Sequence, residues 1–420
     1  ENEIIQERFV PGMKIGKLGL EKRLENHLIG TNAIQRYEVN AYGKRINQLE
    51  HQKGEQGSKI RLTVDTEIQK ACGELLNEKA GSISVMDIYT GDIIAMYSSP
   101  SYNPNLFLFG ISQDEWQLIR NNPLKPLINK TLSGLYSPGS TIKPIVALSA
   151  LENKVIDTKF KVKCTGKMEL YGQTFHCWKE KGHGWVSLKN AMKQSCDTYF
   201  YEVARLLGVD RLNITAEKFG LGKKVLGDYF DNEKKGLFPN TKWKKNNLGK
   251  GWVLGETLIT GIGQGYTQTT PLQLCMMTAQ IANGGFAVKP KIIVDSNPIS
   301  YEDAKQSMES GLLFDTDSEE LLDKKLFKNQ KNIKIVQEAM FASTNERFGT
   351  SYKSRIDDPK YQFAGKTGTA QVKRISKRER ELDLELEQIP YKDRDHALYV
   401  AYGPYICLLY TSPSPRDKSS

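Results

Sequence analysis

The spacing of apolar positions divides the chain into β-rich ends and a helical middle. SKIRLTVDTEIQKACGELL, residues 58–76, predicts a strand at 60–64, an Asp/Thr cap and an amphipathic helix. GSISVMDIYTGDIIAMYSSPSYNPN follows with two β-rich runs about a Thr-Gly-Asp turn, a pattern typical of a hairpin. Helical patterns continue to residue 290, and strands return at 361–372 and 395–402. Strands at both ends with helices between them predict an α+β fold whose sheet closes late in the sequence.

The same pattern predicts the domain boundaries. Residues 1–57 hold Gly-punctuated sequence and one short strand, too little for a core of their own, whereas residues 58–405 can form a large domain. After Tyr405 the chain reads ICLLYTSPSPRDKSS, which is Ser/Pro-rich and has no apolar period. We expect residues 406–420 to be foreign read-through sequence, with a natural disordered tail as the alternative.

The start of the chain, ENEIIQERFV, has neither an initiator methionine nor the apolar core of a signal peptide. No run of 18 apolar residues occurs, so a membrane-spanning segment is not predicted within the chain. We therefore expect a fragment that lacks its true beginning.

Composition and charge narrow the function classes. The chain has 420 residues and is 39% hydrophobic, which is ordinary for a globular protein. Fifty-nine Lys plus Arg against 49 Asp plus Glu leave a net charge of +10, which favours an anionic neighbourhood or is simply a solvated basic surface. Basic stretches interleaved with aromatics, reading-helix zinc spacings and RNA-recognition signatures are all missing from the sequence. Nucleic acid is therefore not an expected partner.

The stretch SPGSTIKP, residues 137–144, carries the first candidate chemistry. A Pro-Gly turn precedes a predicted helix, so Ser140 and Lys143 share one face of its first turn. Serine becomes a nucleophile when a neutral base takes its proton, and burial together with the helix dipole would lower the lysine pKa. The Ser140 amide is also available to an oxyanion. A Ser-x-x-Lys match occurs about once or twice by chance in a chain of this length, so the motif alone is weak.

Two further stretches raise its significance. KQSCDTYFYEVA places Ser195 and Asp197 at a break between helices, where Asp197 is positioned to cap the second helix. YQFAGKTGTAQV is a predicted strand with Lys366, Thr367, Gly368 and Thr369, whose glycines suggest close approach by a ligand or a bulge. Ser195 follows Ser140 by 55 residues (195 − 140) and Lys366 follows it by 226 (366 − 140), and this ordered set is far rarer than its parts.

The set resembles the penicillin-binding protein and serine β-lactamase superfamily, and more narrowly the elongation-type class B penicillin-binding proteins. The resemblance covers about residues 8–405 and includes the stretches RFVPGMKIGKLGLEK, SSPSYNPN, GLYSPGSTIKP, SCDTYFYEVA, GIGQGYTQTTPLQL and RDHALYVAYGPY. It implies a transpeptidase fold with an antiparallel sheet flanked by helices, in which residues 1–57 are the remnant of an N-terminal pedestal (dimerisation) domain. GIGQGY itself predicts a tight turn near the active cleft, since it lacks the strand and lysine of a phosphate loop.

The resemblance also implies residue roles. Ser140 would be the acyl-forming nucleophile, Lys143 its general base, and Ser195 a proton relay to the leaving amine, helped by Lys366. The amides of Ser140 and Thr369 would form the oxyanion hole, and Thr367 and Thr369, on the strand with Gly368, would bind the substrate carboxylate.

Two departures from the family pattern stand out. Asp197 replaces the usual Asn; it can bond Lys143 but cannot donate as an amide does. The closing strand and terminal helix expected after Tyr405 are missing, which would expose a sheet edge and lower stability.

Cysteines add a candidate metal site. Cys164, Cys177, His183 and Cys196 fall within 33 residues, and three thiolates with one imidazole suit structural zinc. A Cys164–Cys177 disulfide and plain buried thiols are alternatives, and His176 is an alternative nitrogen ligand. Since Cys196 lies between Ser195 and Asp197, a metal there would brace the catalytic loop.

The resemblance implies a serine D,D-transpeptidase that cross-links peptidoglycan stem peptides during cell elongation, binds β-lactams and needs no cofactor for catalysis. Its other implications are a lost membrane anchor, a periplasmic catalytic domain on the bacterial inner membrane, and a membrane glycosyltransferase partner for the N-terminal region. A serine β-lactamase and a β-lactam sensor that acylates without turnover are the rival functions.

The charged stretch KRERELDLELEQ, residues 377–388, predicts a solvated helix.

Overall fold

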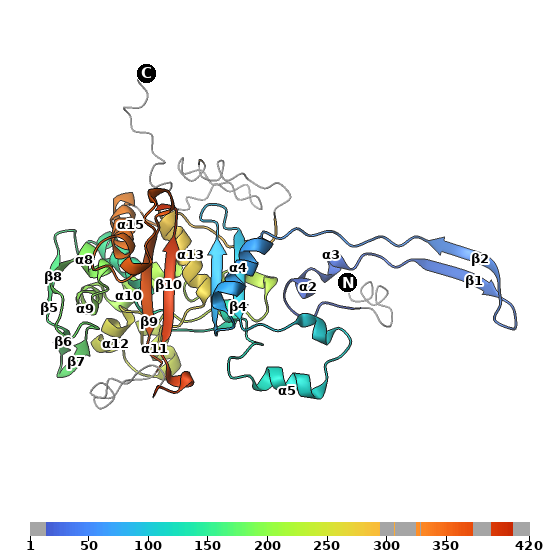
Figure 1. The fold of residues 1–420 in the computed structure, drawn as a ribbon, viewed down its shortest axis with the longest axis horizontal. Coiled ribbons are helices and arrows are strands. Elements are labelled where there is room, and N and C mark those ends of the chain that lie inside the picture. The colour runs from blue at the N-terminus through green and yellow to red at the C-terminus, as the bar shows by residue number, and fades with distance from the viewer. Residues whose placement is uncertain (1–13, 295–305, 307–324, 328, 373–387, 406–420) are drawn as a thin grey trace, which may run out of the picture.

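The computed structural model describes residues 14–294, 306, 325–327, 329–372 and 388–405. The predicted read-through segment lies outside these residues, as does all but the last residue of the predicted charged helix at 377–388. Within them, a long arm leaves a mixed body of helices and strands (Figure 1).

The arm is built from the N-terminal residues. Two short helices, α2 (Gly19–Arg23) and α3 (Glu25–Leu28), lead into the antiparallel hairpin of β1 (Ile34–Val39) and β2 (Arg45–Gln52). Every residue of β2 is exposed, and the hairpin projects away from the body (Figure 1). Since neither face of this hairpin is buried, it has no core of its own, in agreement with the sequence.

Two antiparallel strand pairs lie in the body. β3 (Gly81–Met86) pairs with β4 (Ile93–Ser99), and β9 (Ala364–Ala370) pairs with β10 (His396–Tyr402) in a register that sets Thr369 opposite Ala397. The hairpin around the Thr-Gly-Asp turn and both late strands are thus confirmed. The predicted strand at 60–64 is wrong: among the described residues, only Leu62 of this segment forms a bridge, to Ile293, and no ladder follows.

Helix α4 (Thr66–Leu76) covers the β3–β4 pair and has the predicted cap. The Asp65 carboxylate accepts hydrogen bonds from the amides of Glu67 and Ile68. α13 (Pro271–Ala282) packs against both β3 and β10, and α15 (Gln330–Asn345) packs against β9. The two strand pairs therefore share helix α13, even though their strands do not pair with each other among the described residues.

The main core lies on the helical side of β9. α7 (Lys143–Glu152) is its centre, with Ile145 through Ala150 almost completely buried, so the apolar run is confirmed as core. Helices α8 (Leu188–Lys193), α9 (Asp197–Leu207) and α10 (Val209–Lys218) surround it. Four short strands between α7 and α8 form two antiparallel pairs, β5 with β8 and β6 with β7: β5 (Lys161–Cys164), β6 (Lys167–Leu170), β7 (Gln173–His176) and β8 (Gly184–Ser187).

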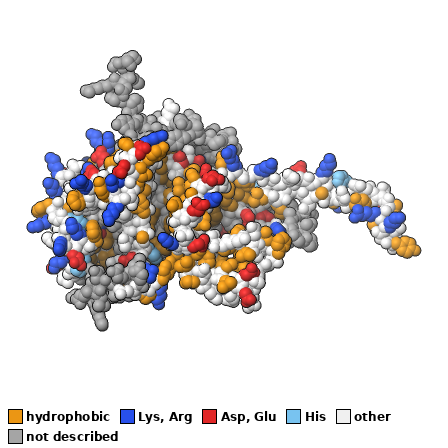
Figure 2. Space-filling view, viewed as in Figure 1, with side chains coloured by type: hydrophobic (Ala, Val, Ile, Leu, Met, Phe, Trp, Pro, Cys, Tyr) orange, Lys and Arg blue, Asp and Glu red, His pale blue; other side chains and the backbone are white. Residues whose placement is uncertain are grey.

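The remaining helices are η1 (Pro104–Phe107), α5 (Gln113–Asn121), α6 (Lys130–Ser133), η2 (Gly139–Ile142), η3 (Gly227–Tyr229), α11 (Thr241–Leu248), α12 (Leu254–Thr260), η4 (Tyr352–Ser354), η5 (Pro359–Tyr361) and η7 (Tyr391–Asp393). Figure 2 shows Lys and Arg side chains scattered over the body and the arm on the face that it draws. Across the described part of the chain, none of the helices has the length and apolar character needed to cross a membrane.

Candidate active site

Ser140 lies in the one-turn helix η2, immediately before α7. The turn depends on Gly139, whose φ of +54° is unfavourable for other residues and whose amide donates to the Gly263 carbonyl oxygen at 2.9 Å. A Cβ on Gly139 would lie 2.5 Å from the Thr369 carbonyl oxygen. Glycine therefore lets the serine turn sit directly against β9, and GIGQGY supplies the tight turn that holds it there, as predicted.

Lys143 begins α7 and is completely buried. Its Nζ donates to the Ser195 carbonyl oxygen at 3.0 Å and Oγ at 3.2 Å, and to Asp197 Oδ1 at 2.7 Å. Among the described residues, its hydrogen bonds go to the Ser195 loop rather than to Ser140 Oγ. The Lys143 ammonium nitrogen thus lies between the serine turn and the loop before α9.

Ser195 is the point where the predicted catalytic residues converge. The residue is 6% exposed and has a φ of +53°, a backbone conformation that is costly for a non-glycine residue. Lys366 Nζ donates to Ser195 Oγ at 2.9 Å, and Lys143 Nζ donates to the same oxygen at 3.2 Å. Three segments that are far apart in sequence therefore meet at one hydroxyl group.

Lys366 lies on β9 and is also completely buried. Burial, and then the charge of Lys143, lower the pKa of Lys366 well below its usual range, although Asp197 opposes this. Burial of Lys366 beside a second lysine therefore favours the neutral form of its amine over the charged form.

Asp197 does not cap α9 as the sequence suggested. It is the first helical residue, Cys196 holds the cap position, and no side chain caps this end. Instead the two oxygens of Asp197 accept from Lys143 Nζ and from the Trp178 amide at 3.0 Å. The Asp197 carboxylate pairs with Lys143 rather than capping the helix, because a buried charge without a partner costs more free energy than a missing helix cap.

Trp178 is a residue of this site that the sequence analysis missed. Its indole Nε1 donates to the carbonyl oxygens of Gln194 and Ser195, both at 3.1 Å, and its ring packs edge-on against His183. Together with the Trp178 amide bond to Asp197, these contacts clamp the Ser195 loop. The only feature of the sequence that could have indicated Trp178 was its position next to Cys177, a predicted metal ligand.

The K-T-G strand packs closely on the serine turn. A Cβ on Gly368 would lie 2.7 Å from Thr141 Cγ2, and one on Gly365 would lie 2.3 Å from Tyr399 Oη. These glycines therefore admit neighbouring protein atoms, and the ligand approach inferred from them stays a prediction. Thr369 is exposed and Thr367 is half-buried, so both hydroxyls remain at the surface of the strand.

Thr350, in the turn after α15, is a second residue that sequence reasoning missed. Thr367 Oγ1 donates to Thr350 Oγ1 at 2.8 Å, and Thr350 Oγ1 shares a 3.2 Å hydrogen bond with Ser343 Oγ. Three hydroxyl groups thus form a chain that ends on the K-T-G strand. No motif in the sequence indicated this contact.

The four predicted metal ligands lie together. The Sγ atoms of Cys164, Cys177 and Cys196 and a ring nitrogen of His183 are all within 4.8 Å of one another. His183 Nδ1 is 3.5 Å from Cys164 Sγ and 3.6 Å from Cys177 Sγ, close to the spacing of about 3.7 Å between ligands at the corners of a zinc tetrahedron. The three thiols are free in the structure, and His176 lies outside the cluster.

The electrostatics of this cluster favour anionic sulfur. A hydrogen bond from Cys196 lowers the pKa of Cys177 to about 2, and the same contact, followed by burial, raises the pKa of Cys196. Burial lowers the pKa of His183, but its contacts with Cys177 and Cys164 raise it overall. His183 Nε2 is buried without a hydrogen-bond partner, while Nδ1 faces the thiols. The donor set therefore fits a thiolate-rich metal site.

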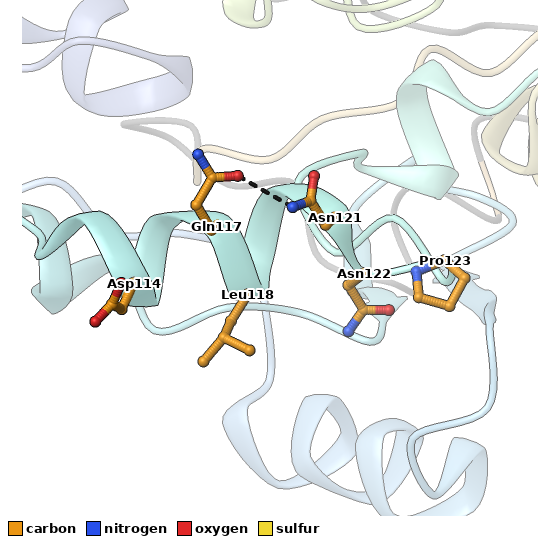
Figure 3. Close-up of a pocket in the computed structure, with 6 residues that line it drawn as sticks. All are labelled: Asp114, Gln117, Leu118, Asn121, Asn122 and Pro123. Atoms are coloured by element: carbon orange, nitrogen blue, oxygen red, sulfur yellow. Dashed lines mark hydrogen bonds between the residues drawn. The ribbon is translucent and has the colours of Figure 1, made fainter.

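A shallow hollow along α5 lies on a different element from these residues. It has no nucleophile or convergent charges, and a hydrogen bond from Asn121 Nδ2 to Gln117 Oε1 at 3.0 Å spans one part of it (Figure 3). Its lining consists of Asp114, Gln117, Leu118, Asn121, Asn122 and Pro123. We therefore assign the candidate chemistry to the Ser140–Ser195–Lys366 region.

Comparison with known proteins agrees with this assignment. The penicillin-binding protein transpeptidase domain model matches residues 81–402, and the penicillin-binding protein dimerisation domain model matches residues 2–62. The peptidoglycan D,D-transpeptidase MrdA of Acinetobacter baumannii is 34% identical over 392 residues, covering 93% of this chain and 55% of the relative. The chain thus spans about half the length of this relative.

Solved structures show the same similarity. Pseudomonas aeruginosa PBP2 in complex with WCK 5153 is 35% identical, with a TM-score of 0.75 over 93% of this chain and 77% of that one. Helicobacter pylori PBP2 in complex with MreC is 31% identical, with a TM-score of 0.78 over 93% of this chain and 66% of that one. The expected α+β transpeptidase fold is confirmed by these matches, and the dimerisation domain model covers the N-terminal residues where the pedestal was predicted.

Proposed function

The chain belongs to the penicillin-binding protein transpeptidase family, and we propose that it is a serine D,D-transpeptidase that cross-links peptidoglycan stem peptides during cell elongation. The observation that carries the proposal is the meeting of two buried lysines on one hydroxyl, with Lys143 Nζ 3.2 Å and Lys366 Nζ 2.9 Å from Ser195 Oγ. Two amines around a hydroxyl provide the proton relay that acyl transfer requires.

In the proposed acylation, Ser140 Oγ attacks the carbonyl carbon of the penultimate D-Ala, and its proton passes to Lys143, which reacts as the neutral amine. The amides of Ser140 and Thr369 stabilise the oxyanion, because backbone donors fixed beforehand cost no reorganisation. The C–N bond then breaks as Ser195 gives its proton to the leaving nitrogen and recovers one from the lysines. An ester on Ser140 and free D-Ala result.

In the proposed transfer, an amine from a neighbouring strand attacks this ester. The new C–N bond forms, the Ser140 Oγ–C bond breaks, and the amine proton returns to Ser140 Oγ through Lys143. Thr367 and Thr369 hold the donor's terminal carboxylate, with Gly368 keeping the strand close to the serine turn. β-Lactams would acylate Ser140 as mimics of the donor.

Among the rival functions, a serine β-lactamase must place a water and a base to hydrolyse the acyl-enzyme. The carboxylate beside the described catalytic residues is Asp197, and its oxygens are engaged by Lys143 and by the Trp178 amide. This arrangement favours a long-lived acyl-enzyme. A β-lactam sensor would also acylate slowly, but would show no turnover of peptide.

The test uses a fluorescent penicillin with the chain and with Ser140→Ala, followed by intact mass. We expect a stable adduct on the chain and none on the variant, together with D-Ala release from a peptide that ends in D-Ala-D-Ala. Rapid turnover of penicillin would instead indicate a β-lactamase, and an adduct without peptide turnover would indicate a sensor.

We also propose that Cys164, Cys177, His183 and Cys196 hold a structural zinc, while catalysis needs no cofactor. Support comes from the mutual ligand distances within 4.8 Å and from the low pKa of Cys177. Zinc bound there would stiffen the Ser195 loop through Cys196. Elemental analysis should find about one zinc per chain, lost in Cys177→Ala and kept in the control Cys72→Ala, whose thiol lies buried on α4. A Cys164–Cys177 disulfide, detected as a loss of two hydrogens by mass, would overturn the zinc assignment.

We infer from the family that the complete protein is anchored in the bacterial inner membrane, with this part in the periplasm. We further propose that the N-terminal region contacts a membrane glycosyltransferase partner. The exposed side chains of Tyr42, Ile46 and Leu49 on the projecting β1–β2 hairpin support a docking role. Triple substitution of these residues by serine should weaken co-purification with the partner and leave penicillin acylation unchanged.

A further inference from the structure

The turn after α15, residues 346–351, connects two of the proposed catalytic segments. Thr350 N donates to the Lys193 carbonyl oxygen at 3.1 Å, two residues before Ser195, and Thr350 Oγ1 accepts from Thr367 at 2.8 Å. Glu346 at its start pairs with both Lys189 at 2.7 Å and Lys193 at 3.0 Å. The turn is therefore held firmly between α8 and β9, next to the strand proposed to bind the substrate carboxylate.

Phe348 occupies an unfavourable position in this turn. Its φ is +68°, a region that bulky residues rarely adopt, and its side chain is 82% exposed. Asn or Gly would relieve the backbone strain, and a polar residue would avoid exposing apolar surface. Strain that persists at a site suggests a functional use for the side chain.

A second exposed aromatic residue with positive φ has an ordinary explanation. Tyr171, 87% exposed with a φ of +48°, lies with Gly172 in the two-residue turn between β6 and β7. Such turns require positive φ at both central positions, whichever residue occupies them. Phe348 lies in no hairpin, so the same reason does not apply to it.

The chemistry of the proposed reaction indicates what Phe348 meets. The carboxylate held by Thr367 and Thr369 belongs to the D-Ala that leaves, so this end of the site is where the attacking amine must enter. The main-chain nitrogens of a peptide joined to a polymer at its N-terminus are amides. The free amine of an acceptor strand is therefore carried on a side chain, which means on a chain of methylene groups.

We propose that Phe348 lines an acceptor subsite and contacts the methylene chain that carries the attacking amine. This inference rests on the proposed transpeptidase function. Phe348 touches the tether rather than the reacting atoms, so it determines specificity and takes no part in proton transfer. Methylene and amine groups both pack favourably on an aromatic face. Phe348 should therefore favour an amine on a long methylene tether over an amine on a short one.

The experiment measures how the acyl-enzyme partitions between aminolysis and hydrolysis. The donor is an acylated tripeptide ending in D-Ala-D-Ala, and the acceptors are Nα-acetyl-lysinamide, with a long tether, and glycinamide, with a short one. The variants are Phe348→Asn, Phe348→Leu and the control Tyr171→Asn. Penicillin acylation of each variant reports the state of the Ser140 site independently.

In Phe348→Asn we expect the aminolysis-to-hydrolysis ratio with the lysine amide to fall about three- to fivefold, and the glycinamide ratio to change less than twofold. Phe348→Leu should keep most of the lysine ratio, and Tyr171→Asn all of it. Penicillin acylation should stay unchanged in every variant.

An unchanged lysine ratio in Phe348→Asn would overturn the acceptor subsite, as would an equal fall with both acceptors. Loss of penicillin acylation in this variant would overturn it too, since the turn would then shape the whole site. A wild-type chain that fails to acylate with penicillin would instead refute the proposed function itself.

Discussion

Lys143 Nζ and Asp197 Oδ1 lie 2.7 Å apart, and the lysine is completely buried while the carboxylate is 13% exposed. This ion pair ties the first turn of α7 to the first turn of α9. It places the proposed general base against the Ser195 loop, and it makes Asp197 part of the proposed catalytic machinery in place of a helix cap.

Asp197→Asn should therefore damage both stability and activity. The amide keeps the shape of the carboxylate but leaves the buried Lys143 ammonium without its counter-charge. We expect a loss of about 3 kcal/mol in the free energy of unfolding, measured in urea, and slower penicillin acylation. The control Glu202→Gln breaks an exposed pair with Arg205 on the same helix and should cost less than about 0.5 kcal/mol. Equal costs in the two variants would contradict this account.

Trp178→Phe tests the clamp on the Ser195 loop. Phenylalanine preserves the ring contact with His183 but removes the Nε1 donor to Gln194 and Ser195. The loss of these hydrogen bonds, worth about 1 kcal/mol, should slow penicillin acylation about fivefold, measured by stopped-flow fluorescence. The control Trp185→Phe, at a 68% exposed position on β8, should leave the rate unchanged. If both variants acylate at the wild-type rate, the clamp has no catalytic role.

Lys366→Met should separate stability from activity. Because the folded pKa of Lys366 is lowered, the unfolded chain binds a proton there that the folded chain does not. The free energy of unfolding of the wild type therefore rises with pH between the lowered pKa of Lys366 in the folded chain and the ordinary lysine pKa of about 10.4 in the unfolded chain. Methionine removes the free-energy cost of burying this amine. Near pH 7 the variant should therefore be more stable than the wild type by on the order of 1 kcal/mol, and this difference should shrink towards pH 10.

The same variant should acylate with penicillin about 100-fold more slowly or worse, since one of the two amines at Ser195 Oγ is gone. Urea unfolding at several pH values and acylation rates measure the two effects. A variant that is less stable than wild type at pH 7 would show that the hydrogen bonds of Lys366 outweigh its desolvation.

Thr350→Val tests the hydroxyl chain that ends on the K-T-G strand. Thr350 Oγ1 accepts a hydrogen bond from Thr367 Oγ1, which fixes the position of the Thr367 hydroxyl group on the strand proposed to bind the substrate carboxylate. Valine keeps the shape but removes the link, so we expect KM for a D-Ala-D-Ala peptide to rise about fivefold with little change in kcat. The control Thr174→Val lies on the exposed face of β7 and should leave KM unchanged. A fall in kcat alone would assign Thr350 a different role.

The sequence by itself determined the elements and the ordered chemistry. The spacing of Ser140 and Lys143 on one helical turn, the cap at Asp65, and the strands at β9 and β10 follow from local periodicity and turn residues, which act over a few positions. The family resemblance also joined Ser195 and Lys366 to that set, and the close cysteines with His183 predicted a cluster that the structure assembles.

Tertiary structure alone decided how these parts meet. Asp197 pairs with Lys143 rather than capping α9, Gly368 packs against Thr141, and the segment at 60–64 forms one bridge rather than a strand. Trp178 and Thr350 joined the candidate site through contacts between distant segments. Local sequence patterns cannot reveal such contacts, because they depend on which buried charges and backbone groups must find partners once the chain has packed.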